Sequence, residues 1–345
     1  MGADESSLSP GDFAVSQCRC RIVVVGPKSG DSALLALSYL PPGARIIATG
    51  NTIEEIMQDG DLYSEANVLF NATGTSETLP DIVDEMPFLV WVHSMSAGVD
   101  HMLCPEIFEN DEIVVTNAKG VFSSSLAEYV IASCTYFAKD IPRLQRQQAA
   151  HNWEKYCVKE LRGSTMGIVG YGSIGAACAK LAKVYGMRIL ALRRNPDNSR
   201  SDNIVDHTYG MDGLDEIMQQ SDYLVVCLAL TPQTVKFIRE EHFKKAKKGQ
   251  ILINIGRGAL LDEEALIRAL QSGDIAGAAL DVFTQEPLPA SSPLWDLPNV
   301  LISPHTADLT EDSRYTSVKF FTENVAKFLS NDKDLECVVD KSARY

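Results

Sequence analysis

The sequence lacks the features that would place it in a membrane, in an export pathway or on nucleic acid. Its 345 residues contain no apolar run near the roughly 18 to 20 residues that a membrane-spanning helix requires. The first residues, MGADESSLSPGDFAVSQ, are polar and acidic, which excludes a signal or transit peptide. With 31 Lys and Arg against 46 Asp and Glu, the net charge of -15 disfavours a polyanionic partner.

Cysteine and histidine are present, but not at the spacings that hold metals. The eight cysteines are scattered, several inside apolar segments, and form no CxxC pair. The six histidines form no HxxxH or similar ligand pattern. We therefore expect buried, reduced thiols, a cytoplasmic location and no metal site.

One stretch carries a clear binding motif. Residues 165–183 read TMGIVGYGSIGAACAKLAK, which is an apolar strand, a glycine turn and a helix with small residues at helical spacing. This is G-x-G-x-x-G in the strand-turn-helix context that gives it meaning. Gly170 makes the tight turn, Gly172 admits a pyrophosphate close to the backbone, and Gly175 lets the helix pack on the strand. The motif predicts a dinucleotide-binding site.

Continuous apolar runs alternate with amphipathic segments on both sides of this motif, for example RIVVVG, ANVLFNA and GQILINIG. Such runs, separated by helices, are typical of parallel sheets covered on both faces. The predicted fold class is therefore α/β, with two doubly wound parallel-sheet domains and a cleft between them. One is a flavodoxin-like substrate domain, and the other is a Rossmann dinucleotide-binding domain with a succession of six strands.

The expected domain boundaries follow from the order of these elements. We expect residues 1–20 to be a disordered tail, residues 21–120 plus 308–345 to form the substrate domain, and residues 121–307 to form the dinucleotide domain. The substrate domain is discontinuous because a closing helix at residues 312–330 is needed to cover its sheet. The longest helical pattern, residues 123–148, crosses between the domains. We expect Ser125 as its N-cap, Glu128 to complete a capping box, and Pro142 to kink or restart it.

The residues after the second strand of the dinucleotide domain indicate which dinucleotide binds. An acidic residue about 20 positions after the glycines selects NAD, whereas arginine accommodates the 2'-phosphate of NADP. Arg193 stands 193 - 175 = 18 residues past Gly175, and Arg194 follows it. Two guanidiniums favour NADP through charge-assisted hydrogen bonds. The alternative is that these arginines are a solvated pair and that the protein uses NAD.

Three polar residues follow later strands of the same domain: Arg257, Glu286 and His305. Ligands of open α/β sheets bind at the carboxyl ends of the strands, so these side chains are expected to face one crevice beside the glycine turn. Arginine can clamp a carboxylate and polarise a carbonyl. Histidine can donate a proton, and a carboxylate can hold its imidazole. This set suits the reduction of a 2-oxo acid by hydride transfer.

The ordered segments NIGRGALLDEEAL, AALDVFTQEPLP and PLWDLPNVLISPHTA, with the glycine motif and SAGVDH upstream, resemble the D-isomer-specific 2-hydroxyacid dehydrogenase family. The resemblance implies that Arg257 contacts the substrate and that Glu286 and His305 form an acid-base dyad. It further implies that the backbone N–H groups of Ala97 and Gly98 bind the substrate carboxylate. Asp308 departs from the small residue that the family often has. The other implied cofactor contacts are Ser173, Ile174, Thr231, Ile255 and Asp281, the last at the nicotinamide carboxamide.

The resemblance also implies a homodimer, formed through the long helix. Trp153 follows that helix and either packs between domains or reaches the partner subunit's pocket. We predict a reductase that uses NADPH, with NAD possible, to convert glyoxylate, hydroxypyruvate or a similar small 2-oxo acid to the D-2-hydroxy acid. The alternative is a nucleotide-sensing binding protein, similar to the co-repressors of this fold, with little catalytic activity. Arg193 and Arg194 count against it, because such a protein is expected to prefer NADH.

Overall fold

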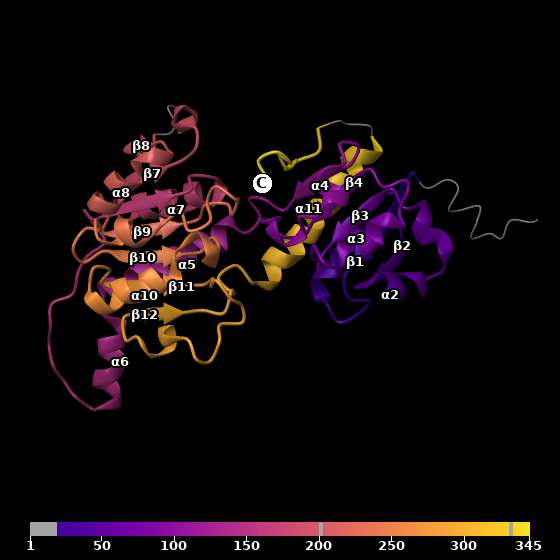
Figure 1. Ribbon diagram of the computed structural model, residues 1–345. Helices are drawn as coiled ribbons and strands as arrows, with labels where there is room; N and C mark the ends of the chain where they lie inside the picture. The colour runs from indigo at the N-terminus through magenta and orange to yellow at the C-terminus, as the bar shows by residue number, and fades with distance from the viewer. Residues whose placement is uncertain (1–18, 200–202, 331–333) are drawn as a thin grey trace, which may run out of the picture. The chain divides into compact units, whose positions relative to one another are not determined.

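The computed structural model describes residues 19–199, 203–330 and 334–345, and the chain forms two compact units (Figure 1). The first unit comprises the described residues up to Val121 together with Thr310–Tyr345. The second unit comprises Phe122–Leu309. Each unit is built on one parallel sheet.

The sheet of the first unit has five strands in the order β2-β1-β3-β4-β5, all of them parallel. This is the flavodoxin-like order, as predicted. Strands β1, β3 and β4 are short and almost wholly buried, which explains why they stand out as apolar runs. Their bounds are β1 Cys20–Val25, β2 Ala44–Gly50, β3 Val68–Asn71, β4 Trp91–Ser94 and β5 Val114–Asn117.

Alternate residues of these strands serve two separate cores. Ile22 and Val24 of β1 face the 3-10 helix η1 (Ser32–Tyr39) and α11 (Glu311–Leu329). Val23 and Val25 face the other layer of helices. The separation follows from the two-residue period of a strand, which sends successive side chains to opposite faces. The helices of the second layer are α2 Ile53–Met57, α3 Leu79–Asp84 and α4 Pro105–Phe108.

The sheet of the second unit has seven parallel strands in the order β12-β11-β10-β9-β6-β7-β8. The order reverses between β6 and β9, so the crevice expected for a ligand opens at the carboxyl ends of these two strands. The sequence predicts six strands, and β8 is the additional one. It has only three residues, none of them fully buried, so it leaves no apolar run. The bounds are β6 Thr165–Val169, β7 Arg188–Leu192, β8 His207–Tyr209, β9 Tyr223–Val226, β10 Ile251–Asn254, β11 Gly277–Leu280 and β12 Val300–Ile302.

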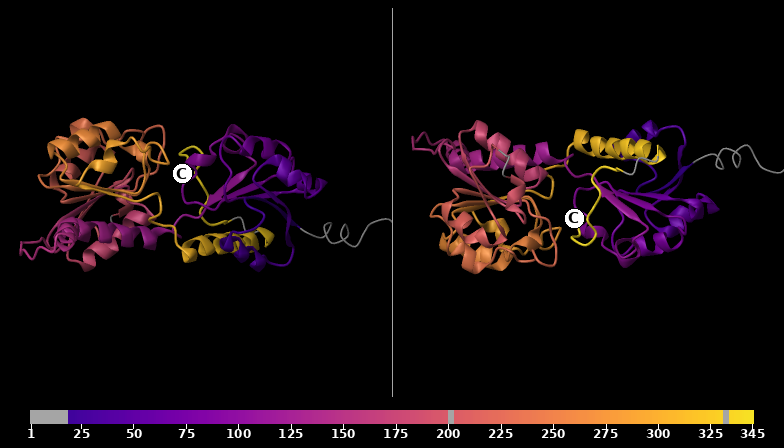
Figure 2. Two further views of the ribbon diagram at one scale, coloured as in Figure 1. Left: turned by 90° about the horizontal axis from the view of Figure 1, so that it is seen from below. Right: turned by 90° about the horizontal axis from the view of Figure 1, so that it is seen from above.

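Helices cover both faces of this sheet (Figure 2). One core joins the strands to α8, α9 and α10. On the other face, α5 and α7 pack against each other. Asp262 caps α10 by accepting a hydrogen bond from the Ala265 N–H at 3.2 Å. The bounds are α5 Ser123–Ala138, α6 Ile141–Ala149, α7 Ser173–Val184, α8 Leu214–Gln220, α9 Glu240–Phe243 and α10 Glu263–Ser272.

The long helical pattern is divided into α5 and α6. Asp140 adopts a left-handed conformation between them, and its side chain caps α6, while Pro142 lies in the first turn of α6. The expected N-cap at Ser125 is wrong, because α5 already begins at Ser123. The Ser125 hydroxyl instead donates to the Ala307 carbonyl at 2.7 Å. The remaining short 3-10 helices are η2 Asp61–Glu65, η3 Asp100–Met102, η4 Pro196–Ser199, η5 Met211–Gly213, η6 Gly258–Leu260 and η7 Pro293–Asp296.

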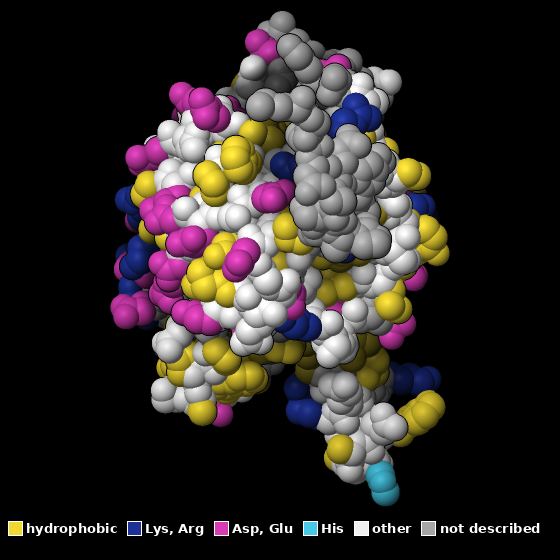
Figure 3. Space-filling model, turned by 90° about the vertical axis from the view of Figure 1, so that its right-hand side faces the viewer, with side chains coloured by type: hydrophobic (Ala, Val, Ile, Leu, Met, Phe, Trp, Pro, Cys, Tyr) yellow, Lys and Arg dark blue, Asp and Glu magenta, His cyan; other side chains and the backbone are white. Residues whose placement is uncertain are grey.

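No helix within the described residues is long and apolar enough to cross a membrane. All seven cysteines in the described ranges are free thiols. On the face drawn in Figure 3, Asp and Glu side chains are interspersed with Lys and Arg. The Lys-rich segment before β10 is engaged, since Lys244, Lys245 and Lys247 form ion pairs with neighbouring carboxylates.

Candidate active site

The glycine turn follows β6 and is packed too tightly for larger residues at two of its three glycines. Gly170 has φ +104°, and a Cβ there would lie 2.6 Å from the Leu228 backbone nitrogen. A Cβ on Gly175 would lie 2.7 Å from the Gly170 carbonyl oxygen. The start of α7 therefore lies directly on the turn, as the dinucleotide-binding motif requires.

Gly172 is different, because nothing in the protein requires glycine there. Its φ is -104°, which any residue adopts, and a Cβ would meet no atom within 4 Å. It is the N-cap of α7 and makes no side-chain cap. In the described part of the chain, the backbone N–H groups of Ser173 and Ile174 find no acceptor. An open space before uncapped N–H groups at a helix N-terminus suits a pyrophosphate.

Arg193 and Arg194 follow β7, the strand beside the glycine turn. The Arg193 N–H donates to the Tyr209 carbonyl at 3.1 Å, and its guanidinium lies 6.0 Å from the centroid of the Tyr171 ring. The Gly170 N–H donates to the Leu192 carbonyl at 3.0 Å, so the arginines begin immediately beside the turn. Positive charge at this place fits the 2'-phosphate of NADP.

Thr231 and Ile255 follow the neighbouring strands β9 and β10. Thr231 is buried in a turn, where its N–H donates to the Thr234 hydroxyl at 2.7 Å. That hydroxyl donates in turn to the Ala229 carbonyl at 2.8 Å. Ile255 is buried at the end of β10. Both residues thus lie at the carboxyl edge of the sheet that also carries the glycine turn.

His305 and Glu286 are in direct contact, although they come from different loops. The His305 Nδ1 lies 2.7 Å from the Glu286 Oε2, and the side chains are 43% and 36% exposed. The other carboxylate oxygen of Glu286 accepts from the Phe283 N–H at 2.9 Å. Glu286 is thereby fixed by its own loop and holds one nitrogen of the imidazole, leaving Nε2 available for proton transfer.

Arg257 lies in the loop after β10, between the glycine turn and this pair. The Asn254 side chain donates to the Arg257 carbonyl at 3.0 Å and shapes the loop. A Cβ on Gly258 would lie 1.8 Å from the Phe283 carbonyl carbon, so the loop of Arg257 packs directly against the loop that carries Glu286. The close approach brings the three predicted catalytic side chains to one region of the sheet edge.

Asp308 belongs to the same electrostatic environment. Burial raises the pKa of its carboxyl group, while the charges of His305 and Arg257 act in the opposite direction. Both charges therefore lie within electrostatic reach of this carboxyl. The sequence singles out Asp308 only as a departure from the family, and its burial is what the structure adds.

Asp281 has more partners than the expected nicotinamide contact. Its side chain is 2% exposed, and its Oδ1 accepts hydrogen bonds from the Ser303 hydroxyl at 2.6 Å and the Thr306 N–H at 3.0 Å. The Ala307 N–H donates to both carboxylate oxygens at 3.2 Å. Asp281 thus anchors the turn that carries His305. Ser303 was missed from the sequence, where only its place before Pro304 and His305 could have pointed to it.

Ala97 and Gly98 lie in the first unit, in the turn after β4. The Ala97 carbonyl accepts from the Asn117 side chain at 2.7 Å, and the Ser96 carbonyl accepts from the Ala118 N–H at 3.1 Å. Within the described residues, the N–H groups of Ala97 and Gly98 donate to no protein atom. With the carbonyls engaged, the two N–H groups can bind an anion such as a carboxylate.

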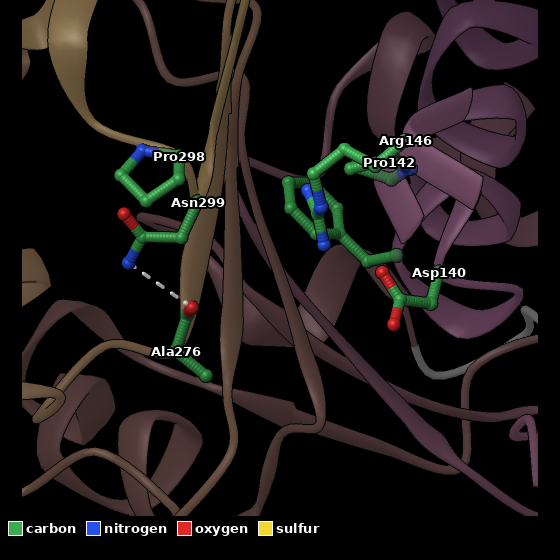
Figure 4. Close-up of a pocket in the computed structure, with 7 residues that line it drawn as sticks. Asp140, Pro142, Arg146, Ala276, Pro298 and Asn299 are labelled. Atoms are coloured by element: carbon green, nitrogen blue, oxygen red, sulfur yellow. Dashed lines mark hydrogen bonds between the residues drawn. The ribbon is translucent and has the colours of Figure 1, made fainter. Parts of the chain in front are cut away.

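A separate hollow of about 380 Å³ lies at the end of the second sheet where the strands begin, opposite their carboxyl ends (Figure 4). Ala276 and Asn299, which precede β11 and β12, line it, and the Asn299 side chain donates to the Ala276 carbonyl at 3.2 Å. Because ligands of such sheets bind at the carboxyl ends of the strands, this hollow is not the candidate active site. Its other lining residues are Phe137, Asp140, Pro142, Arg146 and Pro298.

Comparisons with known proteins agree with the predicted family. Residues 131–307 match the family model described as D-isomer specific 2-hydroxyacid dehydrogenase, NAD binding domain. A glyoxylate reductase from Thermofilum pendens is 34% identical over 260 residues, which are 73% of this chain and 75% of the relative. A glyoxylate/hydroxypyruvate reductase B from Enterobacter sp. (strain 638) is 31% identical, covering 83% and 88%. A D-3-phosphoglycerate dehydrogenase from Methanocaldococcus jannaschii is 32% identical, but the chain spans only 53% of it.

Solved structures give the same result over nearly the whole chain. An NADPH-dependent glyoxylate/hydroxypyruvate reductase from Sinorhizobium meliloti, in complex with NADP and sulfate, has a TM-score of 0.81 at 28% identity and covers 95% of this chain and 100% of its own. A D-isomer specific 2-hydroxyacid dehydrogenase from Xanthobacter autotrophicus Py2, in complex with NADPH and MES, has a TM-score of 0.79 at 27% identity and covers 94% and 99%.

The fold and the match define an oxidoreductase with a dinucleotide-binding domain. The chain belongs to the D-isomer-specific 2-hydroxyacid dehydrogenase family.

Proposed function

We propose that the protein reduces a small 2-oxo acid, such as glyoxylate or hydroxypyruvate, to the D-2-hydroxy acid with NADPH. The contact that carries this proposal is the 2.7 Å pair of Glu286 and His305 beside Arg257 at the cofactor edge of the sheet. The relatives from Thermofilum pendens and Enterobacter bear these substrates in their names, and the Sinorhizobium meliloti enzyme was solved with NADP.

The residues at the glycine turn fit the cofactor. The N–H groups of Ser173 and Ile174 and the open space at Gly172 would hold the pyrophosphate, and Arg193 and Arg194 would hold the 2'-phosphate. Thr231, Ile255 and Asp281 would complete the site. When bound there, the nicotinamide would supply the hydride that reduces the carbonyl carbon of the substrate.

The chain's own residues perform the remaining steps. Arg257 binds the substrate carboxylate and polarises the carbonyl. In the first unit, the N–H groups of Ala97 and Gly98 offer a turn that can bind an anion. As negative charge develops on the carbonyl oxygen, His305 donates its proton to that oxygen and yields the hydroxyl group. Glu286 keeps the imidazole oriented and balances the charge of its protonated form. One hydride and one proton are consumed for each substrate reduced.

NADPH oxidation with a panel of 2-oxo acids tests this function. Activity with glyoxylate or hydroxypyruvate, lost in His305→Gln while NADPH still binds, is the expected result. Tight NADPH binding without turnover of any member of the panel would contradict it.

We further propose a homodimer in the cytoplasm. The helix α6 and the segment after it extend away from the sheet of their own unit (Figure 1). They expose Leu144, Val158 and Trp153, the last of which is 92% exposed. Apolar side chains on such an extension suit pairing with a second copy. Light scattering of the native chain should give twice the monomer mass, and Trp153→Ala should shift it toward the monomer.

A further inference from the structure

The turn that carries His305 is held in a conformation that ordinary residues avoid. His305 has φ +50°, in the left-handed region, and is not a glycine. Strained backbone of this kind persists only where the surrounding structure holds it. Its N–H donates to the Asp281 carbonyl at 2.8 Å, and the Asp281 carboxylate binds the next two N–H groups.

Helix α5 holds the same turn through two side chains on one face. Tyr129 OH lies 2.7 Å from the Ser303 hydroxyl, two residues before His305. The Ser125 hydroxyl donates to the Ala307 carbonyl at 2.7 Å, two residues after His305. Ser125 and Tyr129 are four residues apart, so they lie one helical turn from each other. The two contacts therefore hold the chain on either side of His305 in the sequence.

The direction of the hydrogen bonds follows from the acceptors. The Ser303 hydroxyl donates to the Asp281 Oδ1 at 2.6 Å, where two N–H groups also converge. The proton of Ser303 is therefore engaged, and Tyr129 must be the donor to Ser303. Burial, above all, raises the pKa of Tyr129, so this donor keeps its proton throughout the neutral range.

We propose that Tyr129 and Ser125 are positioning residues, which hold the strained turn so that His305 meets the substrate in the geometry that proton transfer requires. Tyr129 acts through Ser303 and Asp281, and Ser125 acts on the Ala307 carbonyl. The inference rests on the proposed function for the role of His305. Proton transfer is sensitive to such positioning, since a displacement of about 1 Å can cost about 10²-fold in rate.

Tyr129→Phe removes the first donor of the hydrogen-bond series from Tyr129 through Ser303 to Asp281 and keeps the aromatic ring. We expect kcat for 2-oxo acid reduction to fall about 10-fold, with KM for NADPH within about 2-fold of the wild type. The solvent deuterium isotope effect on kcat should rise, because proton transfer then limits the rate more strongly. A variant harmed only in folding would lose active protein without a change in this isotope effect.

Three controls separate positioning from general damage. Tyr223→Phe removes the hydroxyl of another buried tyrosine of the same unit, on β9, and should leave kcat unchanged. Ser303→Thr, which keeps the hydroxyl, should retain activity that Ser303→Ala loses. In a His305→Gln background, Tyr129→Phe should have no further effect on the residual rate, because both changes act on one group.

Hydrogen exchange at the turn tests the inference independently of catalysis. The amides of Thr306 and Ala307 should exchange at least about 10-fold faster in Tyr129→Phe than in the wild type, with no such change in Tyr223→Phe. Unchanged exchange at this turn, or unchanged kcat and isotope effect in an active enzyme, would overturn the positioning role. An inactive wild type with faster exchange in Tyr129→Phe would contradict the proposed function but still support the role of Tyr129 in holding the turn.

Discussion

The glycine at position 172 gives the sharpest prediction, because the protein itself does not require it. Its φ of -104° suits any residue, and an added Cβ meets no protein atom within 4 Å. Gly172→Ala should therefore fold normally and gain about 0.4–1 kcal/mol of stability, since alanine lowers the entropy of the unfolded chain. The added methyl group would occupy the space into which the pyrophosphate must come.

The expected loss of cofactor affinity follows from the size of that group. Overpacking by one methyl group costs about 1–3 kcal/mol, which corresponds to about 5- to 150-fold in Kd. Calorimetric titration with NADPH measures this change, and thermal unfolding without ligand measures the stability. The matched variant is Gly175→Ala, whose Cβ would lie 2.7 Å from the Gly170 carbonyl oxygen. It should lose both stability and affinity.

Two outcomes would refute this reasoning. Wild-type NADPH affinity in Gly172→Ala would show that the pyrophosphate does not approach this backbone. Unfolding of Gly172→Ala in the absence of ligand would show that glycine is needed there by the fold.

Three further variants test the cofactor, the catalytic pair and the buried carboxyl. Arg193→Ala should weaken NADPH binding by about 10- to 100-fold and leave NADH binding nearly unchanged, because it removes a charge-assisted contact to the 2'-phosphate. Equal effects on the affinities for both cofactors in a titration would contradict this prediction. The control is Arg188→Ala, at the start of β7. Glu286→Gln should lower kcat by about 10²-fold without changing the NADPH Kd, since an amide cannot make the carboxylate's contacts with both the Phe283 N–H and the His305 ring. A wild-type kcat in this variant would contradict the catalytic role of the Glu286–His305 pair. Burial raises the pKa of Asp308, so its ionised form opposes folding above about pH 4. Asp308→Asn should raise the Tm at pH 7, with a gain that shrinks as the pH falls toward 4; a gain that grows on acidification would have the wrong sign.

The predictable part of the fold rests on local patterns. Buried parallel strands such as β10 appear as continuous apolar runs, and the glycine turn fixes its own strand and helix. The sequence does not predict β8, because its three half-exposed residues leave no apolar pattern and it pairs with β7 only through the tertiary fold. The predicted N-cap at Ser125 is wrong because three successive serines are equally suitable first residues of the helix. The Ser125 hydroxyl instead donates to the carbonyl of Ala307, 182 residues away.

The site divides in the same way. Arg257, Glu286 and His305 could be proposed because each follows an apolar run, and strand ends of one sheet share an edge. The contact between Tyr129 and Ser303 spans 174 residues and involves types that are common in any sequence. The anchoring role of Asp281 likewise depends on backbone N–H groups, which carry no sequence signal. Long-range hydrogen bonds of this kind become visible only with the structure.

Reduction of hydroxypyruvate tests the central claim most directly, because its product is chiral. NADPH consumption and chiral chromatography of the product should give one D-glycerate for each NADPH oxidised, and His305→Gln should lower both signals to a small residual rate while it still binds NADPH. Formation of the L-isomer, or no oxidation of tightly bound NADPH by hydroxypyruvate or any other 2-oxo acid, would contradict the account.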